Sequence, residues 1–277
     1  MAPLTVPSAT STRRPPIPLR YPLSGLMAAA AVAGLVGCSS TGQLGNLAEI
    51  KQIAASCPLG HEIAGFAAID VSGARLAVAG DAGRLAPVHQ LAERVTACGG
   101  HLRVDVFSGG EGAVGSVYDA DLHAPGATEN ARLRRIPSMV DDVMTTITKN
   151  LPTVAATLPR TGKDIDALFG LSGEYVHQLD PDGTRYVLNL VITTDGVQTE
   201  PPSLTDPALT ADKAVQLASL VQAPNLSGAD VSLTDIGKPP DRSLSSGYVD
   251  ALKAFYRTVC AATKAAHCTI VTDAAGQ

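Results

Sequence analysis

Strand-like apolar runs alternate with segments of helical periodicity along most of this chain, and this alternation limits the folds open to it. Strands are predicted at residues 61–69, 102–107, 116–122, 186–193, 231–236 and 268–271, the third as a short edge strand. Apolar spacing predicts helices around residues 85–95, 137–147, 163–178, 210–221 and 248–259. Pro87 suits the first of these helices only if it lies in the first turn. Such alternation implies an α/β fold with a doubly wound, mostly parallel central sheet flanked by helices.

The first 37 residues are organised like an export signal. Three arginines precede an apolar stretch of 14 residues, 23–36, and Leu35-Val36-Gly37-Cys38 closes that stretch. This arrangement resembles the lipobox of bacterial lipoproteins, which implies a signal peptide at 1–37 and acyl chains such as palmitate on Cys38. An ordinary cleaved signal peptide with an incidental cysteine is the alternative. Because the stretch is shorter than the roughly 18 residues of a spanning helix, we expect a lipid-anchored protein on the extracytoplasmic face of the cell membrane.

The composition and length of the chain limit the classes of partner that it can bind and the number of domains that it can form. Removal of residues 1–37 takes away three of the 21 basic residues and none of the 26 acidic ones, which leaves a net charge of −8. Such a surface does not attract nucleic acid. It also repels anionic lipid headgroups, so membrane attachment must come from the lipid. We expect a tether at residues 38–56 and a single domain at 57–277. With four Phe and no Trp in the chain, its core should be aliphatic.

Four cysteines remain once Cys38 is assigned to the lipid, and disulfides persist outside the cytoplasm. Three pairings of Cys57, Cys98, Cys260 and Cys268 are possible in principle. The positions of these residues around the predicted strands and helices favour Cys57 with Cys98 and Cys260 with Cys268. A zinc site is the competing use, but no C-x-x-C pair is present.

Two predicted strands end in hydroxyl and carboxylate side chains. The first ends in Asp70-Val71-Ser72-Gly73 and the fourth in Thr193-Thr194-Asp195-Gly196. Ligands of doubly wound sheets bind outside the carboxyl ends of the strands, where the strand order reverses. In this pattern the chain resembles the von Willebrand factor A family, whose first strand ends in Asp-x-Ser-x-Ser and whose fourth ends in an Asp-Gly turn. The resemblance spans residues 63–271.

The resemblance implies a divalent metal, Mg²⁺ or Mn²⁺, bound by oxygen ligands. Carried over by position, Asp70, Ser72 and Asp195 match three ligands of the family. Ala74 stands where the family has a second serine, and the threonine of the family's loop falls at Thr161 only if the loop is shifted. Lys163 occupies the aligned position, and its ammonium would replace the metal if it points inward. Alternatively, the two aspartates only hydrogen-bond loop amides.

Other motifs carry less information. Residues 110–115 match G-x-G-x-x-G after a strand, but no helical pattern follows, so a flexible loop is the better interpretation. No G-x-S-x-G motif is present.

We therefore expect a cell-envelope binding domain, not an enzyme, that recognises an extracytoplasmic protein or surface ligand, with or without a metal. A metal-free structural or interaction module is the first alternative. An extracytoplasmic hydrolase is the second, because Asp/Ser/Asp clusters can serve catalysis.

Overall fold

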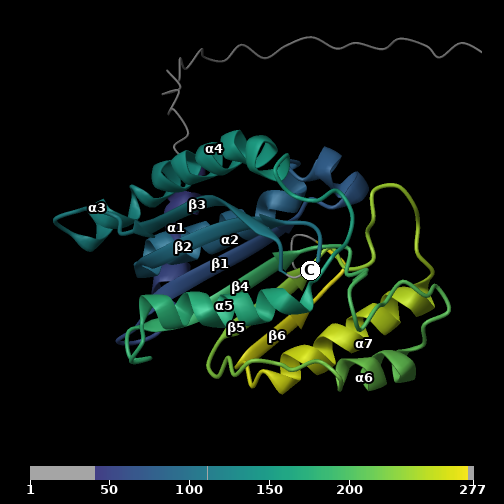
Figure 1. Ribbon diagram of the computed structural model, residues 1–277. Helices are drawn as coiled ribbons and strands as arrows, with labels where there is room; N and C mark the ends of the chain where they lie inside the picture. The colour runs from purple at the N-terminus through teal and green to yellow at the C-terminus, as the bar shows by residue number, and fades with distance from the viewer. Residues whose placement is uncertain (1–40, 111, 274–277) are drawn as a thin grey trace, which may run out of the picture. The chain divides into compact units, whose positions relative to one another are not determined.

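The computed structural model describes residues 41–110 and 112–273, and a six-stranded sheet runs through this part of the chain (Figure 1). Its strands are β1 (Glu62–Asp70), β2 (Gly100–Phe107), β3 (Val114–Leu122), β4 (Tyr186–Thr193), β5 (Asp230–Thr234) and β6 (His267–Ile270). They lie in the order β3-β2-β1-β4-β5-β6. All neighbours pair in parallel except β3, which runs antiparallel at the edge. The predicted α/β, doubly wound fold class is confirmed.

Helices cover both faces of the sheet. They are α1 (Thr41–Ala55), α2 (Ala82–Cys98), α3 (Glu129–Leu133), α4 (Ile136–Ala155), α5 (Asp166–Leu179), α6 (Ala211–Ala218) and α7 (Ser246–Ala262), with a 3-10 turn at Gly73–Val78. One apolar core joins α1, α2 and α4 to β1, β2 and β3, and a second joins α5, α6 and α7 to β1, β4, β5 and β6. Figure 1 shows the sheet between α4 on one side and α5, α6 and α7 on the other.

The order of the strands reverses between β1 and β4. The chain passes from β1 outward to β2 and β3, then returns to β4 beside β1 and proceeds to β5 and β6. Ile69 of β1 pairs with Thr193 of β4, so the two strands end side by side. The polar residues that follow these strands are therefore brought together at the point where ligands of such folds bind.

The segment predicted as a tether at 38–56 is instead helical over Thr41–Ala55, so that prediction is wrong for these residues. Leu47, Ile50 and Ile53 recur at helical spacing and pack on the core beside α2, and Ile50 is only 1% exposed. All described elements belong to one compact unit, residues 40–277. The signal peptide and Cys38 lie outside the described residues, so lipidation stays a prediction.

Pro87 also departs from the sequence-based expectation. Helix α2 begins at Ala82, which places Pro87 in the second turn and not in the first. A proline there cannot donate a hydrogen bond to the preceding turn. Pro87 is nevertheless buried, and we infer that its burial compensates for the lost hydrogen bond.

Two disulfides connect the ends of helices to neighbouring strands or to the segments before them. Cys57 is bonded to Cys98, and Cys260 to Cys268, which are the two pairings that the sequence favours. The first ties the segment before β1 to the end of α2, and the second ties α7 to β6. Over the described residues, no helix combines the length and the apolar character needed to cross a membrane.

Candidate functional site

A buried polar cluster lies where β1 and β4 end, at the reversal point of the sheet. Asp70 is the last residue of β1, and Asp195 follows β4 by two residues. Both are buried, with exposed fractions of 1% and 4%. Buried carboxylates require partners, because desolvation without compensation is costly. The identity of those partners shows what the cluster can do.

Asp70 accepts hydrogen bonds at both oxygens. The backbone N–H and the hydroxyl of Ser72 donate to its Oδ1 at 2.9 and 2.6 Å. The hydroxyl of Thr194 donates to Oδ2 at 2.8 Å. Asp70 and Ser72 lie at the site that the strand-end pattern predicts. That pattern assigns no role to Thr194, although Thr194 belongs to the same polar run as Asp195.

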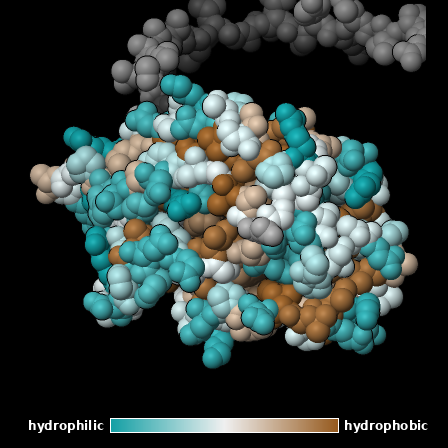
Figure 2. Space-filling model, viewed as in Figure 1, coloured by the Kyte–Doolittle hydropathy of each residue, from teal (hydrophilic) through white to brown (hydrophobic). Residues whose placement is uncertain are grey.

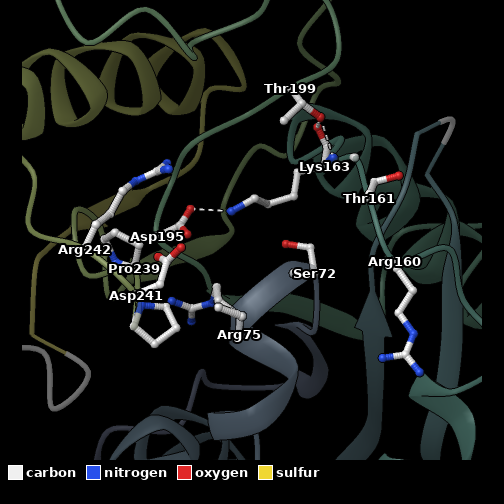
Figure 3. Close-up of a pocket in the computed structure, with 14 residues that line it drawn as sticks. Ser72, Arg75, Arg160, Thr161, Lys163, Asp195, Thr199, Pro239, Asp241 and Arg242 are labelled. Atoms are coloured by element: carbon white, nitrogen blue, oxygen red, sulfur yellow. Dashed lines mark hydrogen bonds and ion pairs between the residues drawn. The ribbon is translucent and has the colours of Figure 1, made fainter.

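Lys163 lies between the two aspartates (Figure 3). Its Nζ is 2.5 Å from Asp195 Oδ1 and 3.4 Å from Asp70 Oδ2, and the residue is 8% exposed. The backbone around it is held by Thr199, whose hydroxyl accepts a hydrogen bond from Lys163 N at 2.7 Å and whose N–H donates to Lys163 O at 3.1 Å. The loop thus fixes the lysine with its ammonium directed inward.

A second set of charges adjoins Asp70. The Nε of Arg75 lies 3.3 Å from Asp70 Oδ2, and its Nη2 lies 3.3 Å from Asp235 Oδ2. Arg84 contacts the same Asp235 oxygen at 2.5 Å. Lys163 and these two arginines therefore balance Asp70, Asp195 and Asp235 charge for charge.

Asp235, Arg75 and Arg84 are not among the site residues predicted from the sequence. Asp235 follows β5 directly, so the reasoning about polar strand ends that selected Asp70 and Asp195 would have found it too. Arg75 and Arg84 lie in the 3-10 turn and in the first turn of α2. No local pattern there indicates that they turn toward a strand end more than 150 residues away.

The residues present do not fit a divalent metal. A cation between Asp70 and Asp195 would have to displace the ammonium of Lys163 and would meet the guanidinium of Arg75 beside Asp70. Ala74 provides no oxygen ligand, and the hydroxyl of Thr161 points away from the lysine in Figure 3. Among the residues described, no group of three or more His, Cys, Asp or Glu is placed to hold a metal.

The loops around the cluster are held by further buried polar groups. Gln198 Oε1 accepts hydrogen bonds from the backbone N–H groups of Ile165 and Asp166, both at 3.1 Å, and its Nε2 donates to Asp166 Oδ2 at 2.7 Å. Burial raises the pKa of Asp166 to about 6, although the hydrogen bond from Gln198 opposes this shift. The hydroxyl of Tyr256 donates to Gly196 O at 2.9 Å. The loop after β4 is therefore anchored to both α5 and α7.

An open pocket of about 260 Å³ lies over the cluster. Four segments line it: residues 72–75, residues 160–163, Asp195 with Thr199, and residues 239–242. Figure 3 shows Arg242 extending toward the Lys163–Asp195 pair, whereas Arg160 points away from it. The pocket therefore combines a rigid, charge-compensated floor with exposed loop residues at its rim.

Comparison with known proteins gives no match, either to a protein-family model or to a curated protein sequence. Function is therefore inferred from the chemistry of the site itself.

Proposed function

We propose that this chain is a lipid-anchored, extracytoplasmic interaction domain that binds a protein or surface ligand at the carboxyl edge of its sheet without a divalent metal. The observation that carries this proposal is the position of Lys163, whose ammonium lies between Asp70 and Asp195. A bound cation would neutralise these carboxylates and hold the loops together. The lysine supplies both effects covalently, so the binding face is assembled in advance.

The state of the carboxylates favours binding over catalysis. Asp70 is occupied by Ser72, Thr194, Arg75 and Lys163, and Asp195 also accepts a hydrogen bond from a backbone N–H at 2.9 Å. A hydrolase needs a nucleophile or general base that can reach its substrate. Carboxylates saturated in this way are suited to a structural task instead.

We also propose that this domain is related to von Willebrand factor A domains. The support for this relation is that Asp70, Ser72 and Asp195, which carry the resemblance, lie together at the reversal point of a mostly parallel sheet. We propose that the chain keeps the binding edge of such a domain and replaces its metal by Lys163.

The proposed location rests on the sequence around Cys38 and on the two disulfides. Disulfides persist in oxidising compartments outside the cytoplasm. Replacement of Cys38 by alanine should move the protein from the membrane fraction to the soluble fraction, because a lipid then no longer anchors it. Unchanged membrane association of this variant would contradict the lipid anchor.

Site-specific photo-crosslinking in intact cells tests the binding edge. A photo-reactive amino acid at Arg242, on the pocket rim, should give a discrete crosslinked product with the full-length anchored protein. The same amino acid at Thr148, exposed on α4, is the control and should give none. The product should persist in the presence of EDTA. Equal crosslinking from both positions would contradict the binding edge, and loss of the product with EDTA would contradict metal independence.

A further inference from the structure

The sheet has a second hollow, on the face that α2 covers only in part. The core on this face ends at Val191 of β4, and no residue of β5 or β6 belongs to it. In the described part of the chain, the apolar residues of β5 and β6 pack instead on the opposite face with α7. Their other face carries Ser232, Thr234 and Thr269, and a pocket of about 250 Å³ lies between these strands and α2.

Buried polar atoms without partners gather under this pocket. Five buried side-chain nitrogen or oxygen atoms in the described residues have no hydrogen-bond partner, and three belong to this one sheet face. They are Asn189 Nδ2, Thr193 Oγ1 and Thr234 Oγ1, on residues that are 5%, 0% and 1% exposed. Thr193 pairs in register with Thr234. Each unpaired buried group costs on the order of 1–3 kcal/mol, so their concentration requires an explanation.

The orientation of the Asn189 amide follows from its neighbour. Arg94 Nε donates to Asn189 Oδ1 at 2.8 Å, and a guanidinium can only donate. The amide nitrogen therefore remains as a donor, and Asn189 lines the pocket. The hydroxyl of Thr234, also in the pocket lining, can both donate and accept.

The charges at this pocket compensate each other. Arg94 Nη2 lies 3.7 Å from Asp230 Oδ2, and His267 Nε2 lies 3.9 Å from Asp230 Oδ1. No unbalanced charge is present to select an ion. On the helix side, Pro87 and Leu91 form an aliphatic wall. The lining contains no Phe, Tyr or Trp ring on which a nucleobase would stack, and its single imidazole, that of His267, is largely exposed.

From these features we propose that this hollow is a second binding site, and that its ligand is a neutral, polyhydroxylated molecule such as a sugar ring. Ligand hydroxyls would accept from Asn189 Nδ2, exchange hydrogen bonds with Thr234, and donate to Asp230. The aliphatic wall would contact the C–H groups of the ring. The volume lies below the roughly 300 Å³ at which pockets for drug-sized ligands begin, which suits a single ring. Both a free sugar and the terminal unit of a glycan present such a ring, and the competition experiment below distinguishes these two sources.

Saturation-transfer NMR with the full-length protein in detergent tests this proposal. The probes are glucose, mannose, galactose, arabinose and N-acetylglucosamine, each at millimolar concentration. At least one should give a signal with the wild type, and Thr234→Val should abolish it. Thr234→Val should fold normally, because it removes an unpartnered hydroxyl and keeps the shape of the side chain. The control Thr148→Val makes the same change at an exposed position on α4 and should retain the signal.

A second variant makes the result independent of the buried hydroxyl. Thr269 is exposed at the mouth of the pocket, so Thr269→Trp should block entry without disturbing the core. A glycan that competes with the monosaccharide signal would identify the polymer as the source. Absence of a signal from every probe, or a signal that survives both pocket variants, would overturn the proposal and leave ordered water as the partner of these groups. Neither outcome bears on the crosslinking from Arg242, because the two sites share no residue.

Discussion

Replacement of Lys163 by methionine is the sharpest test of the charge arrangement at the site. Methionine keeps most of the length of the side chain but removes the ammonium that lies 2.5 Å from Asp195 and 3.4 Å from Asp70. Removal of one partner from a buried ion pair typically costs about 3–5 kcal/mol, because the other charge stays buried without compensation. Asp70 retains Arg75 at 3.3 Å, whereas Asp195 has no other cation in an ion pair within the described residues. We therefore expect a loss of about 3 kcal/mol.

Urea unfolding followed by circular dichroism measures this loss of unfolding free energy. In thermal unfolding, the same loss should lower the Tm by about 6–12 °C for a domain of this size. The double variant Lys163→Met with Asp195→Asn should recover part of it, because no uncompensated charge then remains. Lys149→Met, at an exposed position on α4, is the matched control and should change stability by less than about 0.5 kcal/mol. A loss at Lys163 no larger than that of the control would refute the reasoning, because it would mean that solvent screens the pair.

A second substitution at Lys163 tests whether its ammonium is what prevents a metal from binding. Lys163→Ala leaves two carboxylates and the Ser72 hydroxyl without the ammonium, and such oxygen ligands suit Mg²⁺ or Mn²⁺. At ten times its Kd, Mn²⁺ should stabilise this variant by about 1.4 kcal/mol. The wild type should not respond to Mn²⁺ or to EDTA. Equal stabilisation of both proteins by Mn²⁺ would show that Lys163 does not replace the cation.

Three further changes test separate features of the fold. Because the raised pKa of Asp166, about 6, disfavours the ionised form in the folded state, wild-type stability should fall as the pH rises from about 4 to 6. Asp166→Asn should remove this dependence of stability on pH and should stabilise the protein by up to about 3 kcal/mol at pH 7. If urea unfolding shows the same pH dependence for the variant as for the wild type, Asp166 is not its cause. Replacement of Cys57 and Cys98 by alanine removes a disulfide across 41 residues and should cost about 4 kcal/mol in unfolding free energy. Removal of the disulfide across 8 residues should cost about 2.5 kcal/mol, and a reversed order of the two losses would count against the loop-entropy explanation. Ile50→Ala should lower the unfolding free energy by about 2–4 kcal/mol if α1 packs as a helix. A change smaller than about 0.5 kcal/mol would instead support the prediction that this segment is a tether.

Much of the architecture followed from local patterns in the sequence. The predicted strand at 186–193 coincides with β4, and Thr210 caps α6 by accepting a hydrogen bond from Lys213 N, as its position before the apolar stripe suggests. Local periodicity failed at α1, whose apolar residues form a narrow stripe that is stable only against α2 and the sheet. It also failed at Pro87, whose place within α2 depends on where the helix starts.

The candidate site divides in the same way. The sequence alone identified Asp70, Ser72 and Asp195, because polar residues at the ends of buried strands form a local signal, and it offered Thr161 or Lys163 as the fourth participant. Only the tertiary structure decided between these two, by directing the Lys163 ammonium inward and the Thr161 hydroxyl away. Likewise, the ion pair of Arg75 with Asp235 and the unpartnered amide nitrogen of Asn189 depend on contacts between distant segments. Periodicity determines which face of an element is buried, but charge compensation depends on which elements meet, and that is settled only when the sheet is assembled.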